Sequence, residues 1–273
     1  QEAEAYGRPM VMVDETVARG LVALAQADTA GVDRLTLRAD AANALSGAMT
    51  TAMIGGRVFQ QITGLDQPDN SVTVQTAAGP LSQVKGIHAT AMEITEILLG
   101  AGKDSFAFGN LAQASDNATL AAMVILQAGG GDDAISAQSV LGQQALVLFG
   151  DAERSETAYG TTRPTGADSI DLSEHGSGTI LVDAGLGTDT VLGGDGSLIA
   201  LGGDGADTLQ GGAGWSMLVG DATLLIDRTQ GLASIEAAAS TGNDRLTGGT
   251  GARIVVGDNL LSAAFGVLAR PTA

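Results

Sequence analysis

The sequence predicts an all-β fold: a right-handed parallel β-roll or β-helix, preceded by a less regular N-terminal region that has room for a helix. Three observations support this fold class. Residues 184–219 consist of four consecutive nine-residue units with the pattern G-G-x-G-x-D-x-(apolar)-x, and a fixed period of this kind is typical of repeat architectures. Glycine accounts for 40 of the 273 residues, and aromatic residues for only 3%. The core must therefore consist of small aliphatic side chains, which suits thin stacked coils.

Two nine-residue units make one flattened coil, which consists of a turn, a short strand, a second turn and a second strand. The glycines allow positive φ and close backbone approach in the turns. The apolar residue two positions after the Asp points inward, and stacked coils lie about 4.8 Å apart, the ordinary strand spacing. A single unit cannot bury its apolar face, so only the stack is stable.

The spacing of the acidic residues predicts a row of carboxylates on one edge of the stack. Asp189 and Asp207 both occupy the sixth position of their units and lie two units apart, so they stack on the same edge. The intervening units carry Leu198 and Ser216 at that position, which stack on the opposite edge. Calcium takes about six to eight hard oxygen ligands, such as carboxylates and carbonyls. We therefore expect metal sites along one edge only.

Composition excludes several classes of protein. The net charge of −18 opposes binding to nucleic acids, whose phosphates require a basic surface, and to anionic membranes. Such a charge attracts divalent cations, and without them the folded chain repels itself. Cysteine is absent, so disulfides and thiol chemistry are excluded. No stretch approaches the roughly 18 apolar residues of a transmembrane helix, so we expect no membrane insertion.

Residues 1–70 are expected to form an irregular capping region. Asp14 could begin a helix with apolar residues on one face. The alternative is a connector that only covers the stack. The Ala- and Met-rich stretch 41–53 is expected to be a helix or an irregular loop. Because the chain begins at Gln1 rather than Met, we expect a processed product or a segment of a longer protein.

Residues 71–164 are predicted to form degenerate coils. The segment 129–135 matches the repeat well and places Asp133 at the motif position. The segments 94–106 and 234–246 share one order of motifs, in which an Ile and a Glu precede a G-x-D turn, and they are expected to be copies of one coil.

Residues 165–259 are predicted to be the most regular part, followed by a cap or connector at 260–273. Asp168 lies 21 residues before Asp189, so three extra residues, 172–174, are expected to bulge. A second element of the pattern is a Gly-Asp turn after an apolar strand. It recurs at 148–151, 218–221 and 255–258.

Two segments of this region depart from the repeat. Residues 222–239 are expected to be a looser excursion from the stack. Arg253 occupies the sixth position of its unit, where the pattern calls for Asp. It could replace a metal ion by pairing with a carboxylate of a neighbouring coil, or it could point into solvent.

The units at 184–219 resemble the calcium-binding nonapeptide repeats of RTX proteins. Only the unit that starts at Gly202 matches in full, since Ala184 replaces a glycine in the first unit. The resemblance implies a bacterial protein that is extracellular or on the cell surface, is stabilised by Ca²⁺ and is exported by a type I pathway. It also implies metal binding by the turn glycines and motif aspartates, which are Gly185, Gly187, Asp189, Gly203, Asp204, Gly205, Asp207, Asp133, Asp168 and Asp244.

The alternative for these aspartates is a metal-free β-helix in which they accept hydrogen bonds from backbone N–H groups in the turns. We favour calcium at Asp189 and Asp207, and both interpretations stay open at Asp133, Asp168 and Asp244.

No catalytic residues are predicted, because His88, His175, Tyr6 and Tyr159 lie in no recognisable motif. We therefore expect a structural protein, such as a subunit of a surface layer, adhesin, matrix or filament, that associates with itself or with other surface components. One alternative is a secreted, calcium-dependent enzyme that acts on polysaccharide, since parallel β-helices host such enzymes. The other is the non-catalytic RTX region of a larger toxin or hydrolase.

Overall fold

The protein is described from a computed structural model. The structure describes residues 10–14, 24–26, 34–39, 42–54, 57–66, 72–76, 79–83, 86–90, 92–111, 123–139, 145–154, 156, 164–228, 231–239, 241–258 and 263–266. This part of the chain is built from strands, as the composition predicts. The helix expected between Asp14 and Gly31 is not found in the part of this stretch that the structure describes, so that expectation was wrong there: Asp14 ends one strand and Leu24–Gln26 forms another. Residues 15–23 and 27–33 lie outside the described residues.

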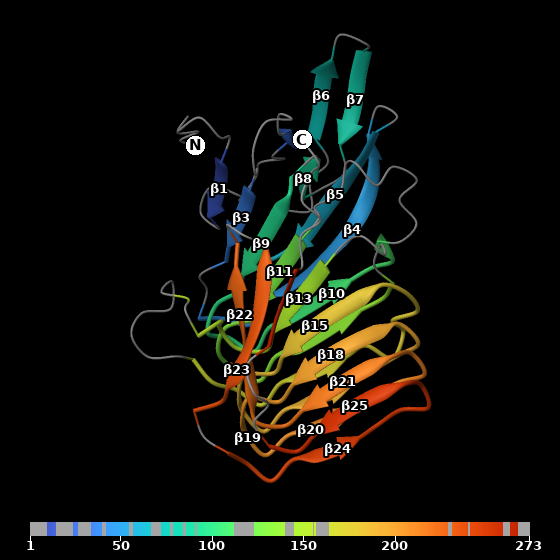
Figure 1. The fold of residues 1–273 in the computed structure, drawn as a ribbon. Helices are drawn as coiled ribbons and strands as arrows, with labels where there is room; N and C mark the ends of the chain where they lie inside the picture. Colours follow the sequence, from blue (N-terminus) through green and yellow to red (C-terminus); the bar gives the residue numbers. More distant parts are fainter. Residues whose placement is uncertain are drawn as a thin grey trace.

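Two large sheets dominate the fold (Figure 1). Sheet A is parallel throughout and contains, in order, β1 (Met10–Asp14), β3 (Arg34–Arg38), β9 (Ile94–Leu98), β11 (Met123–Gln127), β13 (Ala145–Phe149), β15 (Thr179–Asp183), β18 (Ser197–Leu201), β21 (Ser216–Val219) and β25 (Arg253–Val256). Sheet B contains β2 (Leu24–Gln26), β8 (Ile87–Thr90), β5 (Arg57–Gly64), β4 (Ser46–Ile54), β10 (Ser105–Phe108), β12 (Ala134–Ala137), β14 (Ser169–Asp171), β17 (Thr190–Leu192), β20 (Thr208–Gln210) and β24 (Arg245–Thr247).

Three small sheets complete the fold. The short strands β16 (Leu186–Gly187) and β19 (Asp204–Gly205) pair in parallel, and β6 (Val72–Thr76) pairs antiparallel with β7 (Gly79–Gln83). The third sheet joins β22 (Ala222–Asp227), β23 (Leu232–Ala237) and β26 (Ala263–Gly266).

From β9 onward the chain passes back and forth between the two large sheets. Each pass adds one strand to sheet A and one to sheet B, next to the strand laid down by the previous pass. We call one such pair of strands with its turns a coil. The register follows the nine-residue repeat: β17 and β20 pair Val191 with Leu209, and β18 and β21 pair Leu198 with Ser216.

The two sheets differ in the pattern of their side chains. Strands of sheet B alternate between exposed and buried residues, and their buried residues meet the inner face of sheet A in the main core. Strands β9, β11 and β13 of sheet A are buried on both faces, because a second apolar cluster covers the outer face of that sheet. This explains why the sequences of β11 and β13 are almost entirely apolar, while β10 and β12 of sheet B alternate between exposed and buried residues.

The cover is the antiparallel hairpin of β22 and β23, which packs Leu224, Ile226 and Ile235 onto sheet A (Figure 1). Residues 222–239 leave the coils, as the sequence predicts, but they form an ordered hairpin, so the expectation of a loose segment was wrong. The expectation that 94–106 and 234–246 are copies of one coil was also wrong, because β9 lies in sheet A whereas the similar sequence of β23 lies in the hairpin. Apolar residues of the hairpin cover the apolar outer face of sheet A, which the coils alone would leave exposed to solvent.

Buried charges anchor this hairpin to the coils. The Arg228 guanidinium lies 2.6 Å from carboxylate oxygens of both Glu96 and Glu153. The Ile226 N–H donates to Glu153 Oε1 at 2.8 Å, and the Thr223 hydroxyl donates to Asp183 Oδ2 at 2.6 Å. These contacts join residues that are between 40 and 132 positions apart in the chain.

The N-terminal part of sheet B is also extended. The stretch 41–53, expected to be a helix or a loop, contributes β4, so that expectation was wrong. Pairing with β5 and β10 on its two sides overrides the helical preference of Ala and Met. Within the stretch 71–164, which was expected to form coils, β6 and β7 instead form a hairpin of their own.

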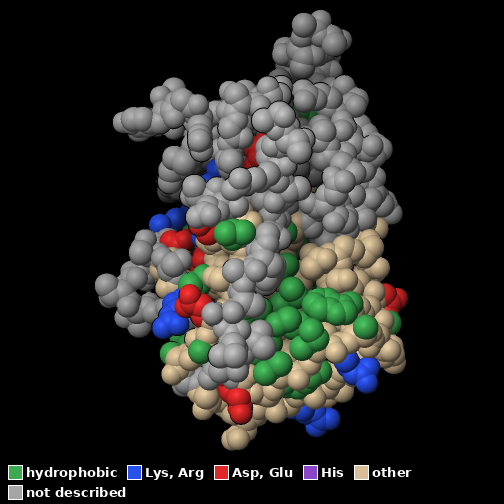
Figure 2. Space-filling model, viewed as in Figure 1, with side chains coloured by type: hydrophobic (Ala, Val, Ile, Leu, Met, Phe, Trp, Pro, Cys, Tyr) green, Lys and Arg blue, Asp and Glu red, His purple; other side chains and the backbone are tan. Residues whose placement is uncertain are grey.

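One face carries exposed apolar side chains. Figure 2 shows hydrophobic side chains gathered over the outer face of sheet A, beyond the hairpin. Along this face Leu181, Ile199, Met217 and Ile254 follow one another in register, and exposure rises from 2% at Leu181 to 48% at Ile254 in the last coil.

Candidate cation sites along the aspartate ladder

Six aspartates, each at the start of a strand of sheet B, form one continuous hydrogen-bonded row that we call the aspartate ladder. The backbone N–H of each aspartate but the last, Asp244, donates to Oδ1 of the aspartate in the next coil, and Oδ1 of the first, Asp104, accepts from the Leu45 N–H. The distances between N and Oδ1 range from 2.6 to 3.0 Å. The members are Asp104, Asp133, Asp168, Asp189, Asp207 and Asp244.

The glycine-rich turns make this row possible. Gly187 and Gly205 have φ of 143° and 140°, in the left-handed region that favours glycine. A Cβ on Gly205 would overlap the carbonyl oxygen of Gly187, and a Cβ on Gly187 would overlap that of Gly166. Only glycine lets the coils approach closely enough for one carboxylate to reach the backbone of the previous coil.

The second oxygen of most ladder carboxylates is buried without a hydrogen bond. Exposure is 1–3% for Asp104, Asp133, Asp168, Asp189 and Asp207. In the described part of the chain their Oδ2 atoms have no hydrogen-bond partner, and the same holds for Oδ2 of Asp221, which is fully buried in the following Gly-Asp turn. An unpaired buried oxygen costs about 1–3 kcal/mol, so each of these positions favours a proton or a cation.

Several of these oxygens lie close to the small residue that follows a strand of sheet A, a place that we call a corner of the coil. Asp207 Oδ2 and the Gly220 carbonyl oxygen both lie within 2.6 Å of the position that a Cβ on Gly202 would take. The same pair of groups recurs at two other corners. Asp168 Oδ2 and the Ala184 carbonyl face Gly150, and Asp244 Oδ2 and the Gly257 carbonyl face Gly220. Two hydrogen-bond acceptors that converge in this way require a positive charge or a proton between them.

Burial dominates the acid–base properties of the ladder. It raises the pKa of Asp133 and of Asp189 to about 8, that of Asp207 to about 7 and that of Asp168 to about 6. The backbone hydrogen bond lowers the pKa in each case, but by less than burial raises it. Neighbouring carboxylates, Asp221 among them, raise the pKa of Asp207 further.

The donor set fits a hard divalent cation such as Ca²⁺. Carboxylate and carbonyl oxygens are the ligands that calcium prefers, and both kinds converge at the corners of Gly150, Gly202 and Gly220. Among the described residues, no group of three His, Cys, Asp or Glu side chains is arranged to hold a metal. A calcium ion at these corners would therefore depend on backbone carbonyls as well as on carboxylates.

The structure brings together most of the residues that the sequence singled out. The five motif aspartates at 133, 168, 189, 207 and 244 lie in one row, and the three extra residues at 172–174 lie in the turn after β14. Gly185, Gly187, Gly203 and Gly205 adopt positive φ in the adjacent turns. Asp204 differs, because it lies on β19, is only half buried and takes no part in the ladder bonds.

Two residues of the site, Asp104 and Asp221, are not among the predicted ones. Asp104 belongs to the ladder, and Gly102 to Phe106 keeps the G-x-D-x-apolar spacing, with Lys103 before the aspartate. Asp221 was seen only as part of a recurring Gly-Asp turn. That recurrence was the signal, since Gly150, Ala184, Gly202, Gly220 and Gly257 follow one another at the ends of adjacent strands of sheet A.

The opposite edge carries no aspartates at the equivalent position. Leu198, Ser216 and Arg253 stack there, as their sixth position predicts. Within the described ranges, the Arg253 guanidinium forms no ion pair with a carboxylate of a neighbouring coil. It donates to the carbonyl oxygens of Gly249 and Gly251 at 2.8 and 3.1 Å, in its own turn. A fixed cation thus satisfies turn carbonyls on this edge.

Neither histidine takes part in the hydrogen bonds of the aspartate ladder. His88 is buried on β8, where burial lowers its pKa, and His175 is buried in the turn after β14 with Nδ1 3.2 Å from the Gln138 carbonyl oxygen. Tyr6 and Tyr159 lie outside the described residues.

Comparison with protein-family models, curated proteins and solved structures gives no match. Among the described residues, no helix has the length and apolar character needed to cross a membrane. The chemistry of the site therefore rests on its geometry.

Proposed function

We propose that this chain is an extracellular, calcium-stabilised structural protein of bacterial type, folded as a right-handed parallel β-roll of the RTX kind. The observation that carries the proposal is the aspartate ladder, in which one oxygen of each carboxylate accepts a hydrogen bond from the previous coil and the other, in every member but Asp244, is buried without a hydrogen-bond partner among the described residues. A protein that worked without cations would be expected to avoid a row of buried carboxylates, because each ionised one is costly.

Calcium would be held by ladder aspartates together with turn carbonyls, and Asp133, Asp168, Asp189, Asp207 and Asp244 are the carboxylates concerned. When bound, the ion supplies the positive charge that lets these carboxylates ionise inside the stack. Binding to the folded state alone makes calcium a folding switch through mass action. Extracellular modules bind calcium at about 10⁻⁴–10⁻³ M, far above cytosolic levels, so the switch would operate after export.

Calcium binding is tested by titration calorimetry and thermal melting from a chelated start. The proposal predicts several equivalents of Ca²⁺ bound at up to millimolar concentrations, a rise in melting temperature, and a much smaller effect of Mg²⁺, which demands stricter octahedral geometry. A chelated protein that is folded and unchanged by millimolar Ca²⁺ would leave the ladder as turn capping only.

Self-association is the second part of the proposal. Among the described strands, β24 and β25 are the last of their sheets and pair with a neighbour on one side only, and Ile254 and Val255 of the last coil are 48% and 45% exposed. Unpaired strand edges with apolar side chains favour pairing with another strand. Sedimentation of the protein and of Ile254→Lys tests this: the proposal predicts concentration-dependent assembly that the charge weakens. A wild-type chain that stays monomeric at high concentration in calcium would contradict it.

A further inference from the structure

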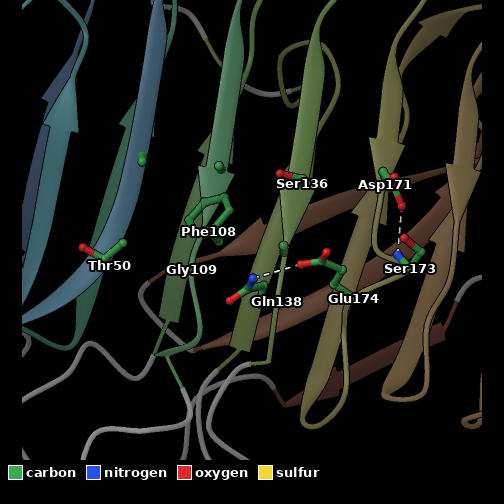
Figure 3. Close-up of a pocket in the computed structure, with 11 residues that line it drawn as sticks. Thr50, Phe108, Gly109, Ser136, Gln138, Asp171, Ser173 and Glu174 are labelled. Atoms are coloured by element: carbon green, nitrogen blue, oxygen red, sulfur yellow. Dashed lines mark hydrogen bonds between the residues drawn. The ribbon is translucent and has the colours of Figure 1, made fainter.

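A groove of about 330 Å³ crosses the outer face of sheet B, away from the buried ladder (Figure 3). It runs over four neighbouring strands, β4, β10, β12 and β14, and so extends along the stack. Its volume lies near the lower end of the roughly 300–1,000 Å³ of ligand sites in proteins. Because it is elongated and open, it suits a chain-like ligand better than a compact one.

Small residues form the floor of the groove. Ala48 and Ala107 point outward at matching positions of β4 and β10, and Gly109 follows at the end of β10. On the next strand Ser136 takes the same place. Side chains of this size leave the backbone of the sheet accessible, and they offer both apolar contact and a hydroxyl.

Polar side chains stand on the side of β12 and β14. Gln138 Nε2 donates to Glu174 Oε2 at 2.9 Å, and the Ser173 N–H donates to Asp171 Oδ1 at 2.9 Å (Figure 3). Hydrogen bonds from Ser173 lower the pKa of Asp171, so this carboxylate is ionised at neutral pH. The exposed members of this wall hold fixed orientations while keeping further acceptor positions free for a ligand.

We propose that this groove binds a saccharide chain that carries no acidic groups. Hydroxyl, amide and carboxylate groups are the partners that sugar hydroxyls need, and Ala48 and Ala107 offer apolar contact to the sugar rings. Among the described residues that line the groove there is no Lys, Arg or His, and Asp171 and Glu174 are acidic. Charge complementarity therefore excludes uronates, sulfated glycans and phosphates, and it favours sugars with amino groups.

This site is independent of calcium binding. Its residues lie on the exposed face of sheet B, whereas the ladder lies between the coils. Glycan binding in this groove is compatible with a structural role at the cell surface, but the inference does not rest on that role.

The test uses the full chain in calcium and three hexasaccharide probes: a neutral β-glucan, chitosan and alginate. Titration calorimetry is expected to show binding of the glucan and of chitosan but not of alginate. The preference for chitosan over the glucan should shrink at high salt, where charge interactions are screened. No binding of glucan or chitosan at millimolar concentration, or equal binding of alginate, would overturn the proposal.

Matched variants locate the site. Ala107→Leu fills the floor and is expected to weaken binding at least tenfold, whereas Ala134→Leu changes an exposed alanine of β12 outside the groove and is expected to have no effect. Asp171→Asn is expected to remove the preference for chitosan and to admit alginate weakly. Because all three positions are exposed, melting temperatures should stay close to the wild type. Equal affinity of Ala107→Leu and wild type would place the binding elsewhere and refute the assignment.

Discussion

Replacing Asp207 with asparagine should have opposite effects with and without calcium. The amide oxygen can still accept the N–H of Asp189, which lies 2.9 Å from Oδ1 in the wild type. The amide nitrogen takes the place of the unpaired Oδ2, next to the Gly220 carbonyl at the Gly202 corner. The variant therefore replaces two facing acceptors by a donor and an acceptor, without a buried charge.

The magnitude follows from the burial of that carboxylate. Relief of one unpaired buried oxygen is worth about 1–3 kcal/mol. At pH 8 the charged form costs about 1.4 kcal/mol for each unit by which its pKa is raised. The rise from 3.8 to about 7 then sets an upper bound of roughly 4 kcal/mol. For a chain of this size, each kcal/mol shifts the melting temperature by about 2–4 °C.

The assay is thermal melting at pH 8 in chelator and in millimolar calcium. Asp207→Asn is expected to melt several degrees above wild type in chelator, and to gain less from calcium because it has lost a charged ligand. Asp207→Ala should lose stability in both conditions, since the Asp189 N–H is left without an acceptor. Asp195→Asn, an exposed turn carboxylate, is the matched control and should change neither. A variant less stable than wild type in chelator, with an unchanged response to calcium, would refute the reasoning.

Three further perturbations test other parts of the structure. In chelator, stability should fall as pH rises from about 4 to about 8, because the pKa of Asp133 and of Asp189 is about 8 in the folded state and near 3.8 in the unfolded state, so the folded state binds more protons. The free energy of unfolding should fall by about 1.4 kcal/mol per pH unit for each of the two groups. Calcium should reduce this pH dependence, because metals bind the deprotonated carboxylate. Urea unfolding at several pH values measures this, and stability that rises across that window would contradict the burial of the ladder. Gly205→Ala should lower the free energy of unfolding by several kcal/mol, because the new Cβ would overlap the Gly187 carbonyl oxygen and the residue has a φ of 140°. Gly257→Ala is the control: nothing lies within 4 Å of its Cβ, so urea unfolding should show almost no change. Arg228→Met should lower the free energy of unfolding by about 3 kcal/mol, because the buried Glu153 loses its cation and Glu96 keeps only Arg34. Hydrogen exchange should show the loss concentrated in β22 and β23, and uniform exchange across the coils would argue against a hairpin anchored by charge.

The repeat made the register of the regular coils predictable. A period of nine residues places Asp189 and Asp207 on one edge and Leu198 and Ser216 on the other, and the structure pairs them so. The spacing works because each coil repeats the same hydrogen bonds as the one before. The same logic extends to Asp168 in spite of three extra residues, which the turn after β14 absorbs without changing the strands.

The hairpin could not be predicted from the repeat, because its sequence contains a single glycine, Gly231, and none of the G-G-x-G-x-D units. An indirect signal was present in strands such as Ala145–Phe149, which are apolar on both faces and so require a cover on each side. The covering residues, among them Leu224 and Ile235, lie far along the chain. Long-range contacts of this kind decide which apolar segment supplies the cover, and local pattern does not encode them.

Arg253 shows a similar limit. The sequence indicated a cation at a metal-ligand position, and it suggested a carboxylate partner or solvent. The structure places the guanidinium on the carbonyls of Gly249 and Gly251 instead. The geometry of a tight turn directs several carbonyl oxygens to one point, and this convergence becomes visible only when the backbone is folded.

Long-wavelength diffraction from crystals grown in calcium tests the central claim most directly, since an anomalous difference map locates calcium without reference to any assumed site. The account predicts peaks along the edge of Asp168, Asp189 and Asp207, and none along the edge of Leu198 and Ser216. Well-ordered crystals in millimolar calcium without a peak along the ladder would contradict it.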